Sequence, residues 1–359
     1  MTRWAAAALA ALAVVSAASA APARPLNLGV SVEIRFTDAK TARMILPSGR
    51  LASTLDKGRT WVPSSALTMP LHDLAAVDRR RAYAVATDGR LFATRDGGRW
   101  AQLSPRLRFE TVIAAGPRRL FALTPSHELL VSADGGATWH DSITRVTSIC
   151  GLDARTVLAT RLGSIVRSTD SGRSFRQVFQ PPLVRDRGRV DLACAHGGAW
   201  ATISWLGGAA SQTAYVVLSS SDLGLTWTPR LAEQYFSYWS AVRAAADGPP
   251  MTPVLAPTGP STAVAAGGCS ACGLGATTVL ITKDSGQSWT GAWSGAPSES
   301  SPPILDQANP LTIAFGDRSH GLLVVQDMLR TTSPRLLGTA DGGKTWRFLG
   351  ELPGPVHSA

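Results

Sequence analysis

A short motif containing Ser or Thr, Asp, Gly and an aromatic residue recurs along the chain, and it limits the possible folds more than any other feature. Six copies follow the pattern Ser/Thr-x-Asp-x-Gly-x-x-aromatic, and a seventh, at 94–100, is one residue shorter. The motif aspartates are Asp56, Asp96, Asp134, Asp170, Asp222, Asp284 and Asp341, which lie 36 to 62 residues apart. Seven tandem copies indicate an internal repeat, and such a repeat determines the architecture of the whole chain.

The residue types of the motif are those of a tight turn. The Asp carboxylate can accept hydrogen bonds from backbone N–H groups that follow it, Gly can adopt a positive φ, and the aromatic residue can begin the next strand. A β-like run precedes the motif, as in 128–132 (ELLVS) and 278–282 (TVLIT), and two more apolar runs around a polar turn lie upstream. Each repeat therefore predicts four short strands separated by turns.

Four-stranded antiparallel units at this spacing are typical of β-propeller blades, which close into a ring. The sequence predicts an all-β fold, a single seven-bladed β-propeller of four-stranded antiparallel blades, and no segment has a sustained helical period. Two ways of closing the ring remain open. Blade 1 begins with an inner strand within 30–36 and blade 7 ends with an outer strand within 346–351, or residues around 25–29 supply a closing strand.

The first twenty residues have the pattern of a secretory signal peptide. Arg3 precedes an apolar run at 5–15, and Ala18-Ser19-Ala20 forms a cleavage signal. We therefore expect residues 1–20 to be removed and residues 21–359 to form the propeller. No later stretch reaches the roughly 20 apolar residues of a transmembrane helix, and no cysteine lies at the cleavage site to carry a lipid. The predicted location is periplasmic or secreted.

The chain is basic, with a formal net charge of +10, and arginine supplies most of the positive charge. Such a charge favours anionic partners. We expect a protein with an acidic surface or anionic membrane head groups, and no specific nucleic acid. A compositional bias towards arginine explains part of the charge equally well. We expect the protein to be a monomer.

The chain has four cysteines, and an even number in an exported protein favours disulfides. Cys269 and Cys272 form a C-x-x-C motif, but their Gly-rich surroundings predict no helix that would activate a thiol, and a second motif at zinc spacing is absent. Cys150 and Cys194 lie near the ends of the predicted inner strands of blades 4 and 5. A disulfide between them would join these blades and leave Cys269 and Cys272 to close a local loop.

The repeats resemble the Asp-box, or bacterial neuraminidase repeat, of sialidases, tandem-propeller xyloglucanases, sortilin-type receptors and the photosystem II stability and assembly factor family. The resemblance spans nearly the whole mature chain and is most similar to the assembly-factor type, above all at 149–175 and 313–346. It implies a propeller that binds a partner rather than an enzyme, and a structural role for the seven motif aspartates. Nothing in the chain points to a photosynthetic partner.

A sialidase-like enzyme would need three arginines for the substrate carboxylate, a tyrosine nucleophile with a glutamate, and an aspartate acid/base. The early Arg-Ile-Pro signature is missing, since Ile34-Arg35-Phe36 has no proline. Glu233 and Tyr235 resemble the Glu–Tyr pair only because they lie two residues apart in the sequence. The H-E-x-x-H, G-x-S-x-G and phosphate-loop motifs are absent as well. We expect no catalytic residues, no cofactor and no metal; a glycan-active or glycan-binding propeller remains the alternative.

Basic residues recur where the first strand of a predicted blade turns into the second. They form a predicted basic arc around one mouth of the central channel, across blades 7, 1, 2, 3 and 4: Lys40, Arg43, Arg79, Arg80, Arg81, Arg118, Arg119, Arg155 and Arg318. Arginine grips carboxylates and phosphates with two parallel hydrogen bonds. The alternative is that arginine is the commonest turn residue in an arginine-rich chain.

A weaker candidate is the aromatic cluster between the motifs of blades 5 and 6, formed by Tyr235, Phe236, Tyr238 and Trp239. Exposed aromatic clusters often mark interaction sites, but a buried inner strand of blade 6 accounts for this one as well. Taken together, the sequence predicts a non-enzymatic exported scaffold or assembly factor, with an envelope complex as its candidate target.

Overall fold

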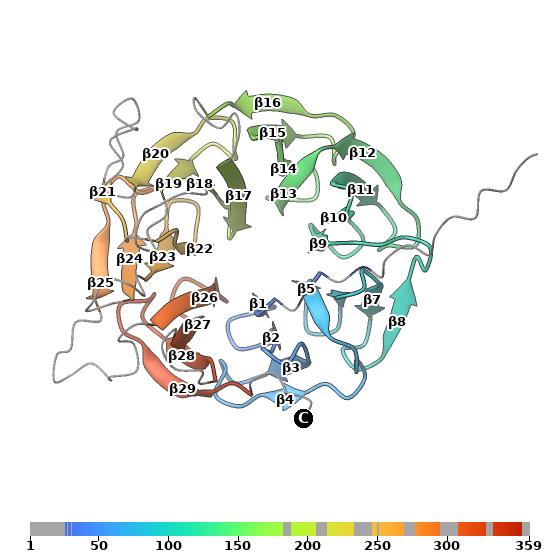
Figure 1. Cartoon of the computed structure of the whole chain (residues 1–359), viewed down its shortest axis with the longest axis horizontal. Helices are drawn as coiled ribbons and strands as arrows, with labels where there is room; N and C mark the ends of the chain where they lie inside the picture. The colour runs from blue at the N-terminus through green and yellow to red at the C-terminus, as the bar shows by residue number, and fades with distance from the viewer. Residues whose placement is uncertain are drawn as a thin grey trace, which may run out of the picture.

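The protein folds into seven antiparallel β-sheets arranged as blades around a central channel (Figure 1). The computed structural model describes residues 26, 28–29, 31–181, 188–205, 214–232, 246–249, 251–268, 277–294, 308–327 and 333–353. Within these ranges the chain forms strands and turns, and no helix. The predicted all-β, seven-bladed propeller is therefore confirmed.

Each blade is a meander whose strands follow one another from the channel to the rim. Blade 1 comprises β1 (Glu33–Phe36), β2 (Ala42–Ile45), β3 (Leu51–Thr54) and β4 (Val62–Pro63). Blade 2 comprises β5 (Leu71–Ala76), β6 (Ala82–Ala86), β7 (Leu91–Thr94) and β8 (Trp100–Leu103). Blade 3 comprises β9 (Thr111–Ala114), β10 (Leu120–Leu123), β11 (Glu128–Ser132) and β12 (His140–Thr144). Blade 4 comprises β13 (Val146–Gly151), β14 (Val157–Arg161), β15 (Ser164–Ser168) and β16 (Arg176–Phe179).

Blades 5 to 7 follow the same order, and blade 5 gains a short fifth strand that pairs in parallel with the fourth. Blade 5 comprises β17 (Gly188–Ala195), β18 (Gly198–Trp205), β19 (Tyr215–Ser220), β20 (Thr228–Ala232) and β21 (Ala246–Asp247). Blade 6 comprises β22 (Val254–Pro257), β23 (Ala263–Gly267), β24 (Thr278–Thr282) and β25 (Thr290–Ser294). Blade 7 comprises β26 (Ala308–Phe315), β27 (Gly321–Asp327), β28 (Arg335–Thr339) and β29 (Arg347–Glu351).

Burial falls from the second strand of a blade to the fourth. Strands β2, β6 and β10 are buried at every residue, whereas β12 and β16 are largely exposed. A middle strand has neighbouring blades on both faces, so its side chains are apolar in succession rather than alternating. This explains the continuous apolar runs in the sequence.

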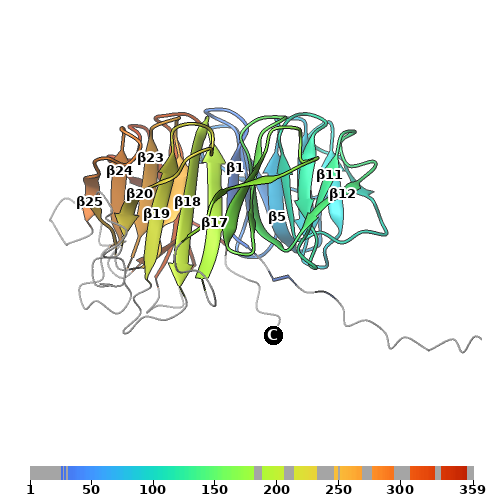
Figure 2. The ribbon, with the colours of Figure 1, turned by 90° about the horizontal axis from the view of Figure 1, so that it is seen from above.

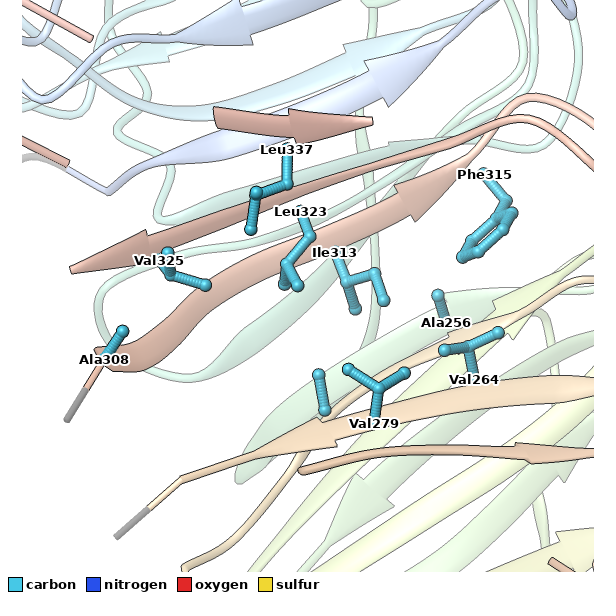
Figure 3. Close-up of a cluster of buried hydrophobic side chains, with 10 residues drawn as sticks. Ala256, Val264, Val279, Ala308, Ile313, Phe315, Leu323, Val325 and Leu337 are labelled. Carbon is cyan, nitrogen blue, oxygen red and sulfur yellow. The ribbon is translucent and has the colours of Figure 1, made fainter. Parts of the chain in front are cut away.

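Buried apolar side chains fill the space between neighbouring blades, and each of the seven blade boundaries has its own cluster. Between blades 6 and 7, Val264 and Val279 face Ile313, Phe315 and Leu323 (Figure 3). The core is thus a ring of separate contacts, and every blade needs both of its neighbours to bury its two faces.

A second-strand side chain of one blade packs on the motif glycine of the next blade at most boundaries. A Cβ atom placed on Gly58 would lie 2.7 Å from Leu322, and one on Gly224 would lie 2.5 Å from Leu158. Phe121 meets Gly172 in the same way, at 2.9 Å, whereas at Gly286 Arg230 is the nearest neighbour (2.7 Å) and Trp200 lies at 3.3 Å. These glycines also have a positive φ of about 82°, so both the backbone and the close approach require glycine.

The ring closes by side-chain packing between two complete blades. The inner strand β1 begins blade 1 and the outer strand β29 ends blade 7, so the first of the two closures is the one found. Ile34 and Met44 of blade 1 pack with Leu322 and Val324 of blade 7. Of the segment proposed as a closing strand, the described residue Leu28 instead lies against blade 2, where its N–H donates to the Thr87 carbonyl (2.9 Å).

Cys150 of β13 and Cys194 of β17 form a disulfide with a Cα–Cα distance of 5.6 Å. It joins the inner strands of blades 4 and 5, which contact each other along the channel. Cys269 and Cys272 lie outside the described residues, as does the predicted signal peptide at 1–20.

Replacing Gly58 by Ala tests the close packing at the ring closure. Because the new methyl group meets Leu322 and the backbone stays at φ +83°, we expect the free energy of unfolding to fall by about 2 kcal/mol. Urea unfolding measures it. Gly291→Ala is the control, since a Cβ at Gly291 has no neighbour within 4 Å; equal losses in the two variants would contradict the packing argument.

The double variant Cys150→Ala, Cys194→Ala tests the link between blades 4 and 5. The disulfide closes a loop with a sequence separation of 44, so its removal should lower the free energy of unfolding by about 3–4 kcal/mol. Urea unfolding without reductant gives this difference, and non-reducing peptide mapping of the wild type identifies the bond. Free thiols at both positions would contradict it.

Candidate functional site

Two sets of turns share one face of the ring. The inner turns join the first and second strands of each blade, and the Asp turns, which contain the seven motifs, join the third and fourth. Backbone hydrogen bonds link the two sets within a blade: Lys57 N–H donates to Lys40 O (2.9 Å), and Ser171 N–H donates to Arg155 O (2.9 Å). We call this surface the turn face; it forms one edge of the ring in the side view (Figure 2).

Four of the inner turns are built around an aspartate. In blade 1, Asp38 Oδ1 accepts hydrogen bonds from the N–H groups of Lys40 (2.8 Å) and Thr41 (2.9 Å). Asp78, Asp153 and Asp317 do the same in blades 2, 4 and 7. Each aspartate fixes its own turn, and each turn exposes a basic residue: Lys40, Arg80, Arg155 and Arg318.

The structure brings most residues of the predicted basic arc to equivalent inner turns. Those exposed are Lys40, Arg79, Arg80, Arg118, Arg155 and Arg318, and those half-buried are Arg81 and Arg119. The turns belong to blades 7, 1, 2, 3 and 4, which are consecutive around the ring (Figure 1). The spacing of these residues along the chain thus corresponds to one structural position.

Ion pairs occupy two of the arginines. Arg79 Nε donates to Asp38 Oδ2 (2.7 Å) across the boundary of blades 1 and 2, and Arg81 pairs with Asp78 (2.6 Å). The Arg79 hydrogen bond holds the pKa of the Asp38 carboxyl well below its usual range. Since these pairs are exposed, their contribution to stability is small.

Arg43 departs from the prediction, because it lies in β2 rather than in an inner turn and is 4% exposed. Its guanidinium donates to the carbonyls of Asp78 (3.1 Å) and Arg79 (2.7 Å). At the corresponding position the neighbouring blades 2 and 7 have Tyr83 and Leu322. Arg43 therefore stabilises the basic turn of blade 2 through hydrogen bonds to its backbone. Because it is buried, it is not available to a partner.

The turn face carries further basic residues that the sequence argument missed, because it treated the motifs only as structural. They lie in the Asp turns: Lys57, Arg59, Arg95, Arg99, Arg173, Lys283 and Lys344. They occupy the variable positions of the motif, so their common face could have been deduced once the motif was recognised as a turn.

Lys57 also takes part in a contact between the last and first blades. Its ammonium donates to His320 Nε2 (2.8 Å), and His320 Nδ1 donates to Asp317 Oδ2 (2.8 Å). His320 lies in the inner turn of blade 7 beside Arg318. The three side chains connect the turn face across the closure of the ring.

The central channel opens on the turn face and has a volume of about 700 Å³. Its wall mixes apolar and polar groups, with Phe36, Ile113 and Ile149 among the apolar lining residues and Asp38, Asp191 and His196 among the polar ones. His196, in the inner turn of blade 5, reaches the Phe315 carbonyl of blade 7 (3.1 Å). The blade 5 turn therefore narrows one side of the mouth.

The described lining residues of the channel do not assemble the sialidase-like site. They include one arginine, Arg35, and no tyrosine. Tyr83 and Tyr215 are buried between blades, and the Tyr215 hydroxyl donates to the Pro249 carbonyl (2.8 Å). Glu233 and Tyr235 lie outside the described residues, together with the whole aromatic cluster of Tyr235, Phe236, Tyr238 and Trp239.

Two inner-strand carboxyl groups bridge neighbouring blades near the channel. Glu33 Oε2 accepts from the Leu74 N–H (2.7 Å), Asp73 Oδ2 accepts from the Val112 N–H (2.6 Å), and Arg35 pairs with Glu33. Burial, together with the nearby Asp73, raises the pKa of the Glu33 carboxyl well above its usual value. Each carboxyl satisfies a backbone donor of the next blade, a structural task.

The aspartates of the Asp turns are occupied by donors of their own turns. Asp134 Oδ1 accepts from the Thr138 N–H (2.9 Å), its Oδ2 accepts from the Thr138 hydroxyl (2.6 Å), and Ser132 Oγ receives the Gly136 N–H (2.8 Å). The shortened turn of blade 2 keeps the backbone bonds, from Gly98 and Arg99 to Asp96. This pattern supports the expectation that these aspartates are structural.

These hydrogen bonds predict a loss of stability in acid. The Ser288 hydroxyl and N–H lower the pKa of Asp284 to about 2, from an ordinary value of 3.8. The folded state therefore binds fewer protons than the unfolded state in this interval, so the stabilisation is complete above about pH 4 and is lost as the pH falls to about 2. The variant Asp284→Asn should have a lower free energy of unfolding than the wild type at pH 7. Its free energy of unfolding should also fall less than that of the wild type between pH 4 and pH 2.

Urea midpoints between pH 7 and 2 measure this effect. Asp141→Asn, at an exposed position of β12, is the control and should follow the wild type. An Asp284→Asn profile that parallels the wild type would contradict a structural role for the carboxylate.

The described residues contain neither a metal-binding cluster nor a membrane-spanning helix. No group of three or more His, Cys, Asp or Glu side chains among them could hold a metal ion. In the same residues no helix is long and apolar enough to cross a membrane.

No family model matches the chain, and no curated protein matches its sequence. Solved structures do match in fold. YCF48 bound to a D1 peptide is 16% identical, with 86% of this chain and 96% of that chain covered and a TM-score of 0.52. YCF48 from Cyanidioschyzon merolae is 14% identical, with coverages of 87% and 94% and a TM-score of 0.54.

A glycoside hydrolase is similar to the same extent. The GH74 enzyme of Niastella koreensis is 12% identical, with 92% of this chain and 68% of that chain covered and a TM-score of 0.55. At these identities the likeness establishes the propeller fold, which both a peptide-binding protein and an enzyme can have.

Proposed function

We propose that this protein is a non-enzymatic, exported scaffold or assembly factor whose basic arc binds an acidic segment of another protein. The observation that carries the proposal is the recurrence of exposed arginine or lysine in five consecutive inner turns around one channel mouth. The inner turns of blades 5 and 6 contain neither arginine nor lysine, so the basic inner turns form one continuous arc.

The local electrostatics favour an acidic ligand. The turn aspartates direct their carboxylate oxygens at their own backbone, whereas Arg80, Arg118, Arg155 and Arg318 extend into solvent. Each guanidinium offers a planar fork that matches a carboxylate. An extended segment rich in Asp and Glu could contact several of these arginines at once.

The fold comparison gives weaker support. YCF48, an assembly factor, is described with a bound D1 peptide, so a propeller of this architecture can take a protein segment as its ligand. We carry over only the class of ligand. A photosynthetic partner does not follow at 16% identity.

Export is part of the proposal. The predicted signal peptide at 1–20 and the disulfide between Cys150 and Cys194 both suit an oxidising compartment outside the cytoplasm. A periplasmic or secreted scaffold would meet its partner there, and an envelope complex is a natural candidate for the assembly.

A glycan-active or glycan-binding propeller is the second candidate, favoured by the similarity to GH74 enzymes. Glycoside hydrolysis needs two carboxyl groups free to act on a substrate. Glu33 and Asp73 are instead bound to backbone donors of the next blade. A panel of fluorogenic glycosides tests this candidate directly, and turnover would favour it.

Reversing the charge of four arc residues tests the leading proposal. The variant Arg80→Glu, Arg118→Glu, Arg155→Glu, Arg318→Glu changes exposed side chains and leaves the turn aspartates intact. We expect it to lose the partners that the wild type retains in affinity purification from the native envelope fraction, and to bind an eight-residue poly-Glu peptide at least about tenfold more weakly. Binding should also weaken as salt is added.

A matched control separates the arc from net charge alone. Arg50→Glu, Arg106→Glu, Arg176→Glu, Arg347→Glu alters exposed arginines away from the inner turns and changes the net charge by the same amount. It should retain the partners and the peptide. Equal binding by the arc variant and the wild type would refute the proposal.

A further inference from the structure

The Asp turn of blade 5 exposes two leucines on the turn face. Leu223 is 45% exposed and Leu225 is 40% exposed. The other full-length Asp turns have polar or small residues at both positions: Lys57, Gly135, Ser171, Ser285 and Gly342 correspond to Leu223, and Arg59, Ala137, Arg173, Gln287 and Lys344 correspond to Leu225. Blade 5 is therefore the exception at these two positions of the Asp turn, and it is the Asp turn that exposes two neighbouring leucines among the described residues.

The fold does not need these leucine side chains. The turn is held by Asp222, which accepts from the Leu225 N–H (3.0 Å) and the Thr226 N–H (2.8 Å), and by Ser220, which receives the Gly224 N–H (2.8 Å). Leu223 has a φ of +57°, which costs a residue with a Cβ about 1 kcal/mol. Lys57, Ser171 and Ser285 adopt a similar positive φ at this position, so the conformation belongs to the turn and does not require a leucine.

The leucines lie where the basic arc ends. Arg167 Nε of blade 4 donates to the Leu223 carbonyl (2.9 Å), and Leu158 of blade 4 packs on Gly224. Arg155, the last residue of the arc, belongs to the turn just before β14, which contains Leu158. Basic and apolar surfaces therefore meet at the boundary of blades 4 and 5.

We propose that Leu223 and Leu225 form an apolar anchor for the same acidic protein segment that the basic arc binds, so that the segment carries an apolar side chain next to its acidic run. This inference rests on the proposed function and narrows its ligand. The arc supplies charge, which attracts any acidic segment, while the anchor selects those with an apolar residue at one end.

The surface fits an extended protein segment better than a lipid bilayer. A segment can place carboxylates on blades 1 to 4 and one apolar side chain on blade 5, matching a surface that is charged on one side and apolar on the other. A bilayer would also engage Leu55, which is 70% exposed in the Asp turn of blade 1 among basic residues. Leu55 therefore distinguishes the two partners experimentally.

The test exchanges the anchor for residues that blade 6 already uses in the same turn. The variant Leu223→Ser, Leu225→Gln copies Ser285 and Gln287, so the turn hydrogen bonds are retained and the fold should persist. Two probes are compared: an eight-residue poly-Glu peptide, and the same peptide followed by Leu-Leu-Trp. Burial of one such side chain corresponds to about a tenfold gain in affinity.

We expect the wild type to bind the apolar-tailed peptide about tenfold more tightly than plain poly-Glu, and the variant to bind both peptides as the wild type binds plain poly-Glu. Leu162→Ser is the matched control, because Leu162 is 60% exposed with a φ of +52° in the β14–β15 turn of the opposite face. It should leave both affinities unchanged. Circular dichroism and the unfolding midpoint report whether each variant folds.

The possible results separate this inference from the proposed function. Binding of plain poly-Glu with no gain from the tail, or a gain that the variant retains, would overturn the anchor and leave the basic arc standing. If neither peptide binds the wild type, both proposals fail. Binding of anionic phosphatidylglycerol vesicles that is weakened by Leu55→Ser as well as by the anchor variant would replace the protein segment with a membrane.

Discussion

Contact between neighbouring blades is the constraint on which the rest of the structure depends. A single four-stranded blade cannot bury two faces, so each blade is stable only between two others. The close approach of a second-strand side chain to the motif glycine of the next blade, as between Leu322 and Gly58, sets how tightly the blades pack. The same glycine supplies the positive φ of the Asp turn, so one residue serves both the turn and the boundary.

The candidate binding surface is a consequence of this arrangement. Because every blade repeats the same meander, its inner turns return to the same face and the same distance from the channel. Charge introduced at one turn position therefore accumulates around the mouth. Arg43 shows the exception: at the boundary of blades 1 and 2 an arginine replaces the usual apolar packing residue, and its hydrogen bonds to Asp78 and Arg79 carbonyls support the most basic turn.

The candidate contact residues lie in the turns and not among the motif aspartates that identify the fold. The motif aspartates are occupied by their own turns, and the inner-strand carboxyl groups of Glu33 and Asp73 are bound to backbone donors. The groups that we propose for binding a partner are the arginines of the inner turns and the two leucines of blade 5. These groups differ from blade to blade, which gives a symmetric ring one asymmetric face.

Much of the fold could be predicted because its information is local. A turn such as 132–139 is held by hydrogen bonds within a few residues, so the motif alone identifies it, and seven motifs determine the number of blades. The inner-turn position of Arg79 and Arg118 also followed from the order of apolar runs. The prediction for Arg43 failed because it lies only two residues beyond its turn, and burial against blade 2 cannot be read from one repeat.

The sequence by itself determined the all-β class, the seven blades, the turns and the surplus of arginine. Tertiary structure decided which of those arginines reach solvent, which closure the ring adopts, and which side chains from distant repeats share a surface. His196 reaching Phe315, Lys57 meeting His320, and Leu223 bordering blade 4 are contacts of this kind. The physical reason is that a turn depends on bonds within one repeat, whereas a surface depends on how separate repeats pack around the ring.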